Sequence, residues 1–506
     1  MEEGDRFTLT TEDVEGTKEK VSVTYLDLPN DLQVGSRVLI DDGLIELKVD
    51  RIAGPEVQCT VVNGGKVGSR KGVNLPGIKV NLPALTEKDI EDLKFGIAND
   101  FDIVAASFIR SASDVTRIRK VLEENGGDGI HIIAKIENQE GVDHIDEILE
   151  VSDGIMVARG DLGVEIPPEE VPLVQKQLIA KANQRSKPVI TATQMLESMV
   201  NSPRPTRAEA NDVANAIFDG SDSIMLSGET AAGSFPLEAV ATMARIAEKA
   251  ESSINYSKLL TRQPDGVTTN VTNAISFAAC TTAAELNTAC ISTITQSGFT
   301  ARMISKHRPV CPIVAATMSD QVWRQLNLVW GCKPMLYKEK LQQGQVFDTG
   351  MNITQKSGLV KNGDTVVLAL GMPLGVSGAT NTLRVDIVGD VLFKGIGVGT
   401  KKASGRARVI KRREDMERNF QKGDILVVAA TDNDFMPYIQ KASAIIVGPM
   451  DHSDDCHAEI AGRALDIPVI VCNAKVTDFI PNDALISVDA STGFVCAGLP
   501  QNKHKG

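Results

Sequence analysis

Alternation of apolar and polar residues dominates the first 75 positions of the chain. Short runs rich in β-branched residues are separated by turn signals such as Asp42–Gly43 and Asn63–Gly65. A period of two residues is typical of strands that bury one face. We therefore predict a small β-barrel over residues 1–75, with strands near 7–11, 20–25, 37–40, 44–49 and 57–62.

From Thr86 the pattern changes to helical periods that alternate with short apolar strands. Thr86 and Asp89 predict a capped helix to about residue 98, and strands follow near 103–109, 130–136, 154–158, 188–192 and 223–226. A polar cluster follows each strand, and this is where a (β/α)8 TIM barrel keeps its active site. We predict a partial TIM barrel of five βα units over residues 76–255. Because closure needs eight strands, this α/β barrel is expected to be incomplete.

The remaining chain divides into two further predicted domains. Residues 265–388 repeat the helix and strand alternation, which favours an open α/β domain with strands near 289–295, 312–316, 333–337 and 365–370. Residues 390–506 are rich in glycine and β-branched residues and form a last predicted domain.

The stretch from residue 134 to 167 is a predicted βαβ unit. Lys135 and Glu137 end its first strand, and Asp161 follows its second strand. Neighbouring parallel strands lie roughly 5 Å apart, so the two carboxylates are expected side by side. Paired carboxylates suit Mg²⁺, and a lysine beside them can help to stabilise an enolate or a transferring phosphoryl group. The alternative interpretation is that these charges only solvate the rim of the sheet.

Composition narrows the classes of partner. A net charge of −13 over 506 residues argues against nucleic acid or an anionic membrane as the main partner. No apolar run approaches the roughly 20 residues of a membrane helix, and acidic residues follow Met1 where a signal peptide would be basic and then apolar. The eight cysteines are scattered, which predicts reduced thiols in a cytoplasmic protein.

A loop after the first strand of the third predicted domain could bind phosphate. Residues 296–302 place a glycine and small hydroxyl side chains at the start of a helix, where free backbone N–H groups favour anions. An ordinary helix cap is the alternative.

A second cluster lies near the end of the chain. His452, Cys456 and His457 could be imagined as zinc ligands, but their spacing matches no common zinc site. The simpler interpretation is the start of a helix that ends near Leu465.

Four runs of the sequence closely resemble those of pyruvate kinase. They are Lys135–Gly141, Met156–Gly163, Thr191–Met199 and Pro203–Glu209, and the similarity continues from about residue 4 to residue 388. The resemblance implies a TIM barrel with an inserted β-barrel lid and an α/β regulatory domain. It implies a glycolytic transferase that moves a phosphoryl group from phosphoenolpyruvate to ADP, giving pyruvate and ATP. It also implies Mg²⁺ or Mn²⁺, K⁺, a sugar-phosphate effector and a homotetramer.

The resemblance assigns roles to the residues of the βαβ unit. Lys135 matches the lysine that stabilises the phosphoryl group and the developing enolate, and Glu137 and Asp161 match the ligands of the divalent cation. The backbone at Gly160 and Asp161 matches the group that receives the substrate carboxylate. Thr193 matches a threonine near the enolate carbon, in a water-mediated proton relay.

Other matched positions lie outside this unit. Ser107 matches a residue near the monovalent cation and the phosphate, and Lys71 matches a lysine that reaches the nucleotide phosphates. The first 75 residues resemble a lid whose closure would exclude water from the transfer step. The candidates for the effector phosphate are Thr295, Ser297, Gly298 and Thr300.

The last domain resembles the swivelling phosphohistidine domain of enzymes that use phosphoenolpyruvate. His457 matches the phosphorylated histidine. However, His452 and Ser453 replace the usual glycine pair, and Asp454 and Asp455 would repel a phosphate. We therefore expect a structural or assembly role for this domain.

The resemblance also has a departure. The family begins with three barrel strands before the lid, which supply an arginine for the substrate phosphate, most K⁺ ligands and part of the nucleotide pocket, and no positions here match them. We therefore expect an activity far below that of a complete enzyme, or none. One alternative is a non-catalytic effector-binding or assembly subunit. Another is a different Mg²⁺-dependent enolate enzyme, such as a lyase, although the lid and the effector-type loop argue against it.

Overall fold

The computed structural model divides the chain into two compact units. The first comprises Met1–Thr268 with Ser319–Trp330, and the second comprises Thr269–Met318 with Gly331–Gly506. The structure describes residues 1–41, 43–78, 80, 85–261, 270–338, 345–372, 380–389, 391–412, 415, 420–449 and 456–498. The boundaries of the four predicted domains stay a prediction.

The first unit begins with a six-stranded sheet in the order β2-β1-β5-β4-β3-β6. Its elements are β1 (Arg6–Thr10), β2 (Lys20–Ser22), α1 (Leu28–Asp31), β3 (Arg37–Ile40), β4 (Ile45–Ala53), β5 (Glu56–Asn63) and β6 (Val73–Asn74). Alternate residues of β5, including Val57, Cys59 and Val61, are buried. The period of two residues therefore predicted this sheet because each strand buries one face.

A five-stranded parallel sheet follows, in the order β11-β10-β9-β8-β7. Its strands are β7 (Ile103–Ala106), β8 (His131–Ile136), β9 (Gly154–Ala158), β10 (Val189–Ala192) and β11 (Ser223–Ile224). This confirms the five βα units in the described part of the chain, where β7 and β11 form the two edges of the sheet.

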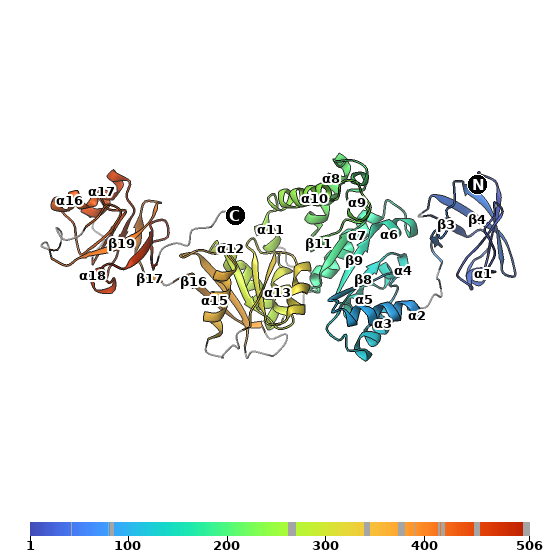
Figure 1. Cartoon of the computed structure of the whole chain (residues 1–506), viewed down its shortest axis with the longest axis horizontal. Coiled ribbons are helices and arrows are strands. Elements are labelled where there is room, and N and C mark those ends of the chain that lie inside the picture. Colours follow the sequence, from blue (N-terminus) through green and yellow to red (C-terminus); the bar gives the residue numbers. More distant parts are fainter. Residues whose placement is uncertain are drawn as a thin grey trace. The chain divides into compact units, whose positions relative to one another are not determined.

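Helices connect these strands. They are α2 (Glu87–Ala98), α3 (Ala112–Glu124), α4 (Gln139–Asp143), α5 (Ile145–Val151), α6 (Arg159–Glu165), α7 (Val171–Gln184), α8 (Arg207–Asp219), α9 (Gly228–Ala231), α10 (Pro236–Glu251) and α11 (Tyr256–Thr261), with a 3₁₀ turn at Glu197–Val200. Thr86 and Asp89 form the predicted capping box of α2. Helices α3, α5 and α7 contact one another in turn, and α3 and α7 pack on the sheet (Figure 1).

The helix predicted between Glu137 and Asp161 is interrupted. His144 ends α4 and precedes α5, and its Nδ1 lies 3.0 Å from the backbone oxygen of Arg110. Ile145, Ile148 and Leu149, which are among the apolar residues that predicted one helix, form the buried face of α5. The helical spacing of the apolar residues predicted which face is buried, but it did not predict the interruption of the helix at His144.

A segment between two strands of the second unit belongs to the first unit. It contains α14 (Asp320–Gln325) and the 3₁₀ turn Leu326–Leu328. Arg324 makes two hydrogen bonds to the carboxylate of Asp102, of 2.6 and 2.9 Å. The Gln325 amide donates to the backbone oxygens of Asp102 and Gly129, at the starts of β7 and β8.

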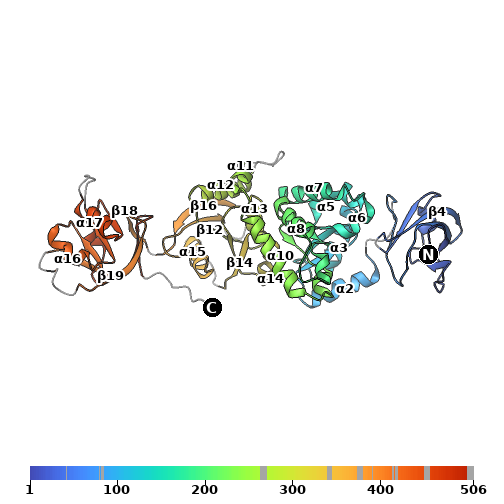
Figure 2. The same ribbon diagram turned by 90° about the horizontal axis from the view of Figure 1, so that it is seen from above.

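The second unit contains a five-stranded sheet in the order β14-β13-β12-β15-β16. Its elements are α12 (Val271–Glu285), β12 (Cys290–Ile294), α13 (Phe299–Ser305), β13 (Ile313–Thr317), β14 (Cys332–Leu336), α15 (Val346–Lys356), β15 (Thr365–Gly371) and β16 (Thr380–Ile387) (Figure 2). The four predicted strands are present and parallel. Strand β16, which pairs antiparallel with β15, was not predicted.

The second unit also contains an eight-stranded sheet in the order β17-β24-β23-β19-β20-β21-β22-β18. Its strands are β17 (Val391–Lys394), β18 (Ile396–Val398), β19 (Lys402–Ile410), β20 (Ile425–Val428), β21 (Ala444–Val447), β22 (Val469–Val471), β23 (Leu485–Asp489) and β24 (Phe494–Ala497). Its helices are α16 (Met436–Ile439), α17 (His457–Leu465) and α18 (Val476–Phe479), with a 3₁₀ turn at Asn433–Phe435. Helix α17 ends where the sequence predicted, and residues 451–455 lie outside the described ranges.

All eight cysteines are thiols outside any disulfide, as predicted. Burial raises the pKa of Cys59 and of Cys290 to about 12, so both stay protonated at neutral pH. Within the described ranges, no helix combines the length and the apolar character needed to cross a membrane.

Candidate active site

The charged residues of the βαβ unit lie at the carboxyl ends of adjacent strands. Lys135 is the penultimate residue of β8 and pairs with Met156 of β9. Glu137 follows β8, while Asp161 lies in the first turn of α6, which starts directly after β9. Parallel pairing therefore brings both carboxylates to the carboxyl ends of neighbouring strands, as the sequence predicted.

Glu137 is buried, with 1% of its surface exposed. One of its carboxylate oxygens lies 2.6 Å from Nζ of Lys135, and the other accepts a hydrogen bond from the backbone N–H of Phe108. The Lys135 ammonium also donates to Oγ of Ser107, at 3.1 Å. The structure thus brings Ser107, Lys135 and Glu137 together.

The electrostatics of this cluster favour a cation. Burial raises the pKa of Glu137, and the nearby negative charge of Asp161 raises it further, against the opposing effects of Lys135 and the Phe108 N–H. Burial and Asp161 also raise the pKa of Glu165, whose carboxylate accepts a 3.0 Å hydrogen bond from Asn74. A buried carboxylate beside a second one is stabilised by a positive ion between them.

The donor set fits a hard divalent cation that shares its ligands with a substrate. Mg²⁺ is usually held by one or two carboxylates, and water and substrate oxygens complete its coordination. Among the described residues, no group of three or more His, Cys, Asp or Glu side chains is placed to hold a metal alone. Glu137 and Asp161 would therefore supply the protein ligands, and oxygens of a bound substrate would supply others.

Thr193 lies at the end of β10, next to the turn that contains Gly160. Its Oγ1 accepts a 2.7 Å hydrogen bond from the Gly160 N–H and donates a 2.6 Å hydrogen bond to the backbone oxygen of Ala192. A Cβ at Gly160 would come within 3.4 Å of the same Oγ1. Thr193 and Gln194 have φ angles of 65° and 53°, a region that β-branched residues rarely occupy.

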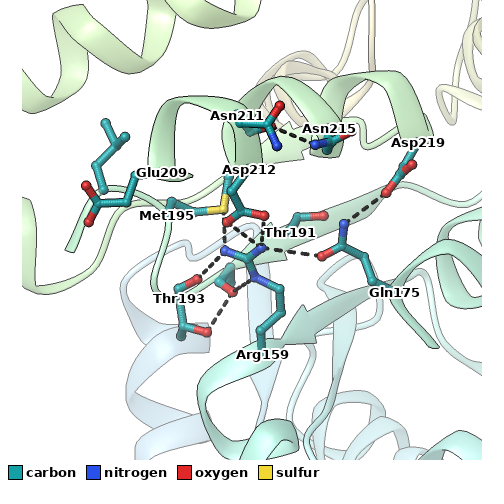
Figure 3. A network of polar contacts seen from close by, with 12 residues as sticks. Arg159, Gln175, Thr191, Thr193, Met195, Glu209, Asn211, Asp212, Asn215 and Asp219 are labelled. Atoms are coloured by element: carbon teal, nitrogen blue, oxygen red, sulfur yellow. Dashed lines mark hydrogen bonds and ion pairs between the residues drawn. The ribbon is translucent and has the colours of Figure 1, made fainter. Parts of the chain in front are cut away.

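Arg159, for which no role was predicted, organises the polar network in Figure 3. The side chain is 8% exposed, between the ends of β9 and β10. Its guanidinium donates to the backbone oxygens of Ala192 and Thr193, and its Nη1 lies 2.7 Å from the Asp212 carboxylate. The sequence carried one signal for this role, which was an arginine directly after a fully buried strand. It could not indicate the partners of Arg159, because these come from distant helices and from the backbone.

Lys71 lies in the loop before β6, and its Nζ is 2.8 Å from the carboxylate of Asp41. A cavity of about 1490 Å³ in the first unit is lined by Lys71, Ser107, Phe108, Asn138 and Glu165, among others. The predicted nucleotide residue thus shares a cavity with a residue of the Lys135 cluster.

Three candidates for an effector site, Thr295, Ser297 and Gly298, lie between β12 and α13 in the second unit, and Thr300 lies in the first turn of α13. Gly298 is the N-cap of α13 and has a φ of 74°. Thr295 and Thr300 are buried, and the Thr300 hydroxyl lies 2.8 Å from that of Thr380. Ser297 is exposed, and its backbone oxygen accepts a 3.0 Å hydrogen bond from Arg302. The Thr300 hydroxyl therefore has a partner within the protein.

His457 is the first residue of α17. Its Nδ1 lies 3.0 Å from Oγ1 of Thr431, and its Nε2 lies 3.3 Å from Oδ1 of Asn433. Both ring nitrogens therefore have side-chain partners. The zinc alternative includes His452, which lies outside the described residues.

Comparison with known proteins gives three family matches along the chain. Residues 1–240 match the family described as "Pyruvate kinase, barrel domain", and residues 273–386 match "Pyruvate kinase, alpha/beta domain". Residues 420–493 match "PEP-utilising enzyme, mobile domain".

The similarity to curated proteins extends over nearly all of the chain. A pyruvate kinase of Geobacillus stearothermophilus is 49% identical over 501 residues, which cover 98% of this chain and 85% of the relative. A pyruvate kinase of Staphylococcus aureus strain MRSA252 is 46% identical over 500 residues, with the same coverage.

Proposed function

The chain belongs to the pyruvate kinase family, and on this premise we propose that the cluster at the ends of β8, β9 and β10 is its active site. The chain is a phosphotransferase of glycolysis that forms pyruvate and ATP from phosphoenolpyruvate and ADP. Neither the non-catalytic subunit nor the lyase is favoured, because pyruvate kinases match over 98% of the chain. The proposed site depends above all on one observation, the buried Glu137 carboxylate that contacts Lys135 beside Asp161.

The proposed reaction has two steps. A terminal oxygen of ADP attacks the phosphorus of phosphoenolpyruvate, the bond between phosphorus and the enol oxygen breaks, and its electron pair stays on the enolate. The enolate carbon then takes a proton that comes from water, which gives pyruvate. Lys135 carries a fixed positive charge beside the transferring group and the developing enolate, where such charge is most effective.

Glu137 and Asp161 would hold Mg²⁺ or Mn²⁺, which supplies positive charge to phosphoryl and enolate oxygens. The substrate carboxylate would be received by the backbone N–H groups of Gly160 and Asp161. For this, the Gly160 N–H must exchange its hydrogen bond with Thr193 for one with the carboxylate.

Thr193 would guide the proton to the enolate carbon through a bound water. Its hydroxyl already donates to the Ala192 oxygen, so the proton must be supplied by a water that the hydroxyl orients. Lys71 would contact the phosphates of ADP, and Ser107 would lie close to the phosphoryl group of the substrate.

Several finer features follow as proposals from the family. We infer a K⁺ requirement, a sugar-phosphate effector at the β12 to α13 turn, a homotetramer and a cytoplasmic location. The proposed domains are residues 1–75, 76–255, 265–388 and 390–506. We propose that the last of them acts in structure or assembly, since His457 is held by Thr431 and Asn433.

The rate of turnover is a separate prediction. The sheet that carries the site has five strands in the described part of the chain, and a closed barrel of this type has eight. We therefore expect the 506-residue polypeptide to turn over more slowly than the Geobacillus relative, measured side by side. Equal rates would show that the three further strands of a closed barrel are not needed for the chemistry.

The test of the proposed function is the stoichiometry and the metal requirement of the reaction. The purified chain should form pyruvate and ATP in equal amounts from phosphoenolpyruvate and ADP, with Mg²⁺ and K⁺ present. Chelation of the divalent cation should stop the reaction, and its replacement by Mn²⁺ should restore it. Pyruvate without ATP would instead indicate transfer of the phosphoryl group to water, as in a phosphatase.

A further inference from the structure

The turn after β10 holds two consecutive residues in a strained backbone conformation. Thr193 and Gln194 both have positive φ angles, and neither is glycine. Such conformations persist only where the surrounding contacts enforce them, and they are frequent at functional sites. The contacts that enforce this turn are therefore part of how the Thr193 hydroxyl is placed.

Arg159 makes three of these contacts. Its Nη2 donates to the backbone oxygen of Thr193 at 2.6 Å and lies 2.8 Å from the sulfur of Met195. Its Nε donates to the backbone oxygen of Ala192 at 3.3 Å. One planar group thus contacts the residues on both sides of the turn and the turn itself (Figure 3).

Two helices fix the guanidinium from the other side. Asp212 of α8 accepts from Nη1 at 2.7 Å, and Gln175 of α7 lies 3.5 Å from the same nitrogen. Gln175 is itself held by Asp219, at 3.0 Å. The Asp212 carboxylate compensates the positive charge of a side chain that is 8% exposed.

The donors of Arg159 are fully used by the protein. A guanidinium has five N–H groups, and five acceptors surround it, on Ala192, Thr193, Met195, Gln175 and Asp212. No N–H remains for a substrate phosphate or carboxylate. Arg159 therefore acts on the reaction only through the groups that it holds.

We propose that Arg159 is a positioning residue, which holds Thr193 in the left-handed conformation that directs its hydroxyl to the Gly160 N–H and to the protonation site. This inference rests on the proposed function of Thr193. A lysine at position 159 keeps the charge but presents one nitrogen in place of the planar fork, so it cannot span two carbonyl oxygens and Asp212 together.

The first experiment is a double-mutant cycle on pyruvate formation with Arg159→Lys and Thr193→Val. Arg159→Lys alone should lower kcat by about 10²-fold. In the Thr193→Val background the Arg159→Lys change should lower kcat by less than about threefold, because the hydroxyl that Arg159 positions is already absent. Independent, multiplying effects would overturn the proposal.

The matched control is Arg185→Lys. Arg185 makes a comparable contact, from Nη2 to Asp146 at 2.8 Å, at the far end of α7. The Arg185→Lys variant should keep the wild-type kcat. A loss of kcat comparable to that of Arg159→Lys would contradict a specific role for Arg159.

A second readout separates positioning from general loss of structure. Phosphoenolpyruvate that is stereospecifically labelled at its methylene carbon should give pyruvate of one methyl configuration with the wild-type chain in isotopically labelled water. With Arg159→Lys, more of the product should be racemic, because enolpyruvate leaves before it is protonated. A slower variant with unchanged configuration would count against the proposal.

A crystal structure of the Arg159→Lys variant gives an answer that does not need turnover. We expect Thr193 to leave the left-handed region and its bond to the Gly160 N–H to be lost. Retention of both would overturn the inference whether or not the chain is active. Loss of both in a chain that forms no pyruvate would support the inference, and only the proposed function would then have failed.

Discussion

Two turns of this molecule join a parallel strand to the next polar segment, and both contain a residue with positive φ. After β10 that residue is Thr193, with a φ of 65°, and after β12 it is Gly298, with a φ of 74°. Glycine adopts this conformation without a steric penalty, whereas a β-branched residue does not. The first turn therefore needs Arg159 to hold it, and the second needs no such support.

The two turns also differ in the charge of the side chains that are buried near them. The first sheet places the buried Glu137 beside Lys135, and burial raises the pKa of the carboxylate. In the described part of the second turn, the buried polar side chains include those of Thr295 and Thr300, which are neutral. Buried charge together with enforced backbone strain thus distinguishes the proposed catalytic turn from the turn at Gly298.

The largest effect should come from the buried charge. Glu137→Gln should lower the rate of pyruvate formation by about 10³-fold, since it removes a proposed metal ligand and the negative charge beside Lys135. Mn²⁺ binding, measured by electron paramagnetic resonance, should weaken in parallel. The control is Glu124→Gln on the exposed end of α3. Wild-type rate and Mn²⁺ affinity in Glu137→Gln would show that the carboxylate is only structural.

Thr193→Gly should separate strain from chemistry. The loss of the hydroxyl should lower kcat by about 10²-fold. The free energy of unfolding should stay level or rise, because glycine tolerates the φ of 65°. Urea unfolding and steady-state kinetics of the same preparation check both effects. A large loss of stability would mean that Thr193 is not strained.

A smaller effect, of about 2 kcal/mol at pH 5, should come from His307 in the second unit. Burial, with a contribution from Lys306, lowers the pKa of His307 from 6.5 to about 4. The unfolded chain therefore binds the proton first, so this contribution to stability is present above pH 6.5 and is lost as the pH falls towards 4. Urea unfolding at pH 7.5 and at pH 5 should show that the free energy of unfolding falls less between these two pH values in His307→Gln than in the wild type. Equal losses would mean that the ring is accessible to water.

The smallest effect should come from the second turn itself. Gly298→Ala should lower the free energy of unfolding by about 1 kcal/mol, because a Cβ is disfavoured at a φ of 74°. In the absence of any sugar phosphate, turnover should not change. A large change in basal kcat would mean that this turn is more than an effector site or a cap.

The sequence located most strands of the two parallel sheets because each is an apolar run that ends in a polar cluster. Gly154–Ala158 was predicted residue for residue, and Thr86 was correctly predicted as a cap. The antiparallel strand β16 was not predicted, and neither was the break at His144, which a contact to the distant backbone of Arg110 accompanies. Such features depend on tertiary contacts that no local pattern contains.

The candidate site shows the same limit. Parallel pairing is enough to bring Glu137 and Asp161 to one edge of a sheet. The role of Arg159 could not be predicted, because its acceptors include two backbone oxygens and a sulfur atom. Only the fold brings residues 175, 192, 193, 195 and 212 around one guanidinium.

The most direct test of the central claim is the rate of ATP formation from phosphoenolpyruvate and ADP by the wild-type chain and by Lys135→Met. Lys120→Met, which removes an exposed lysine of α3, is the control. We predict a metal-dependent rate that Lys120→Met retains and that falls by at least about 10²-fold in Lys135→Met. Equal rates in the wild type and Lys135→Met, or no ATP from the wild type, would contradict the account.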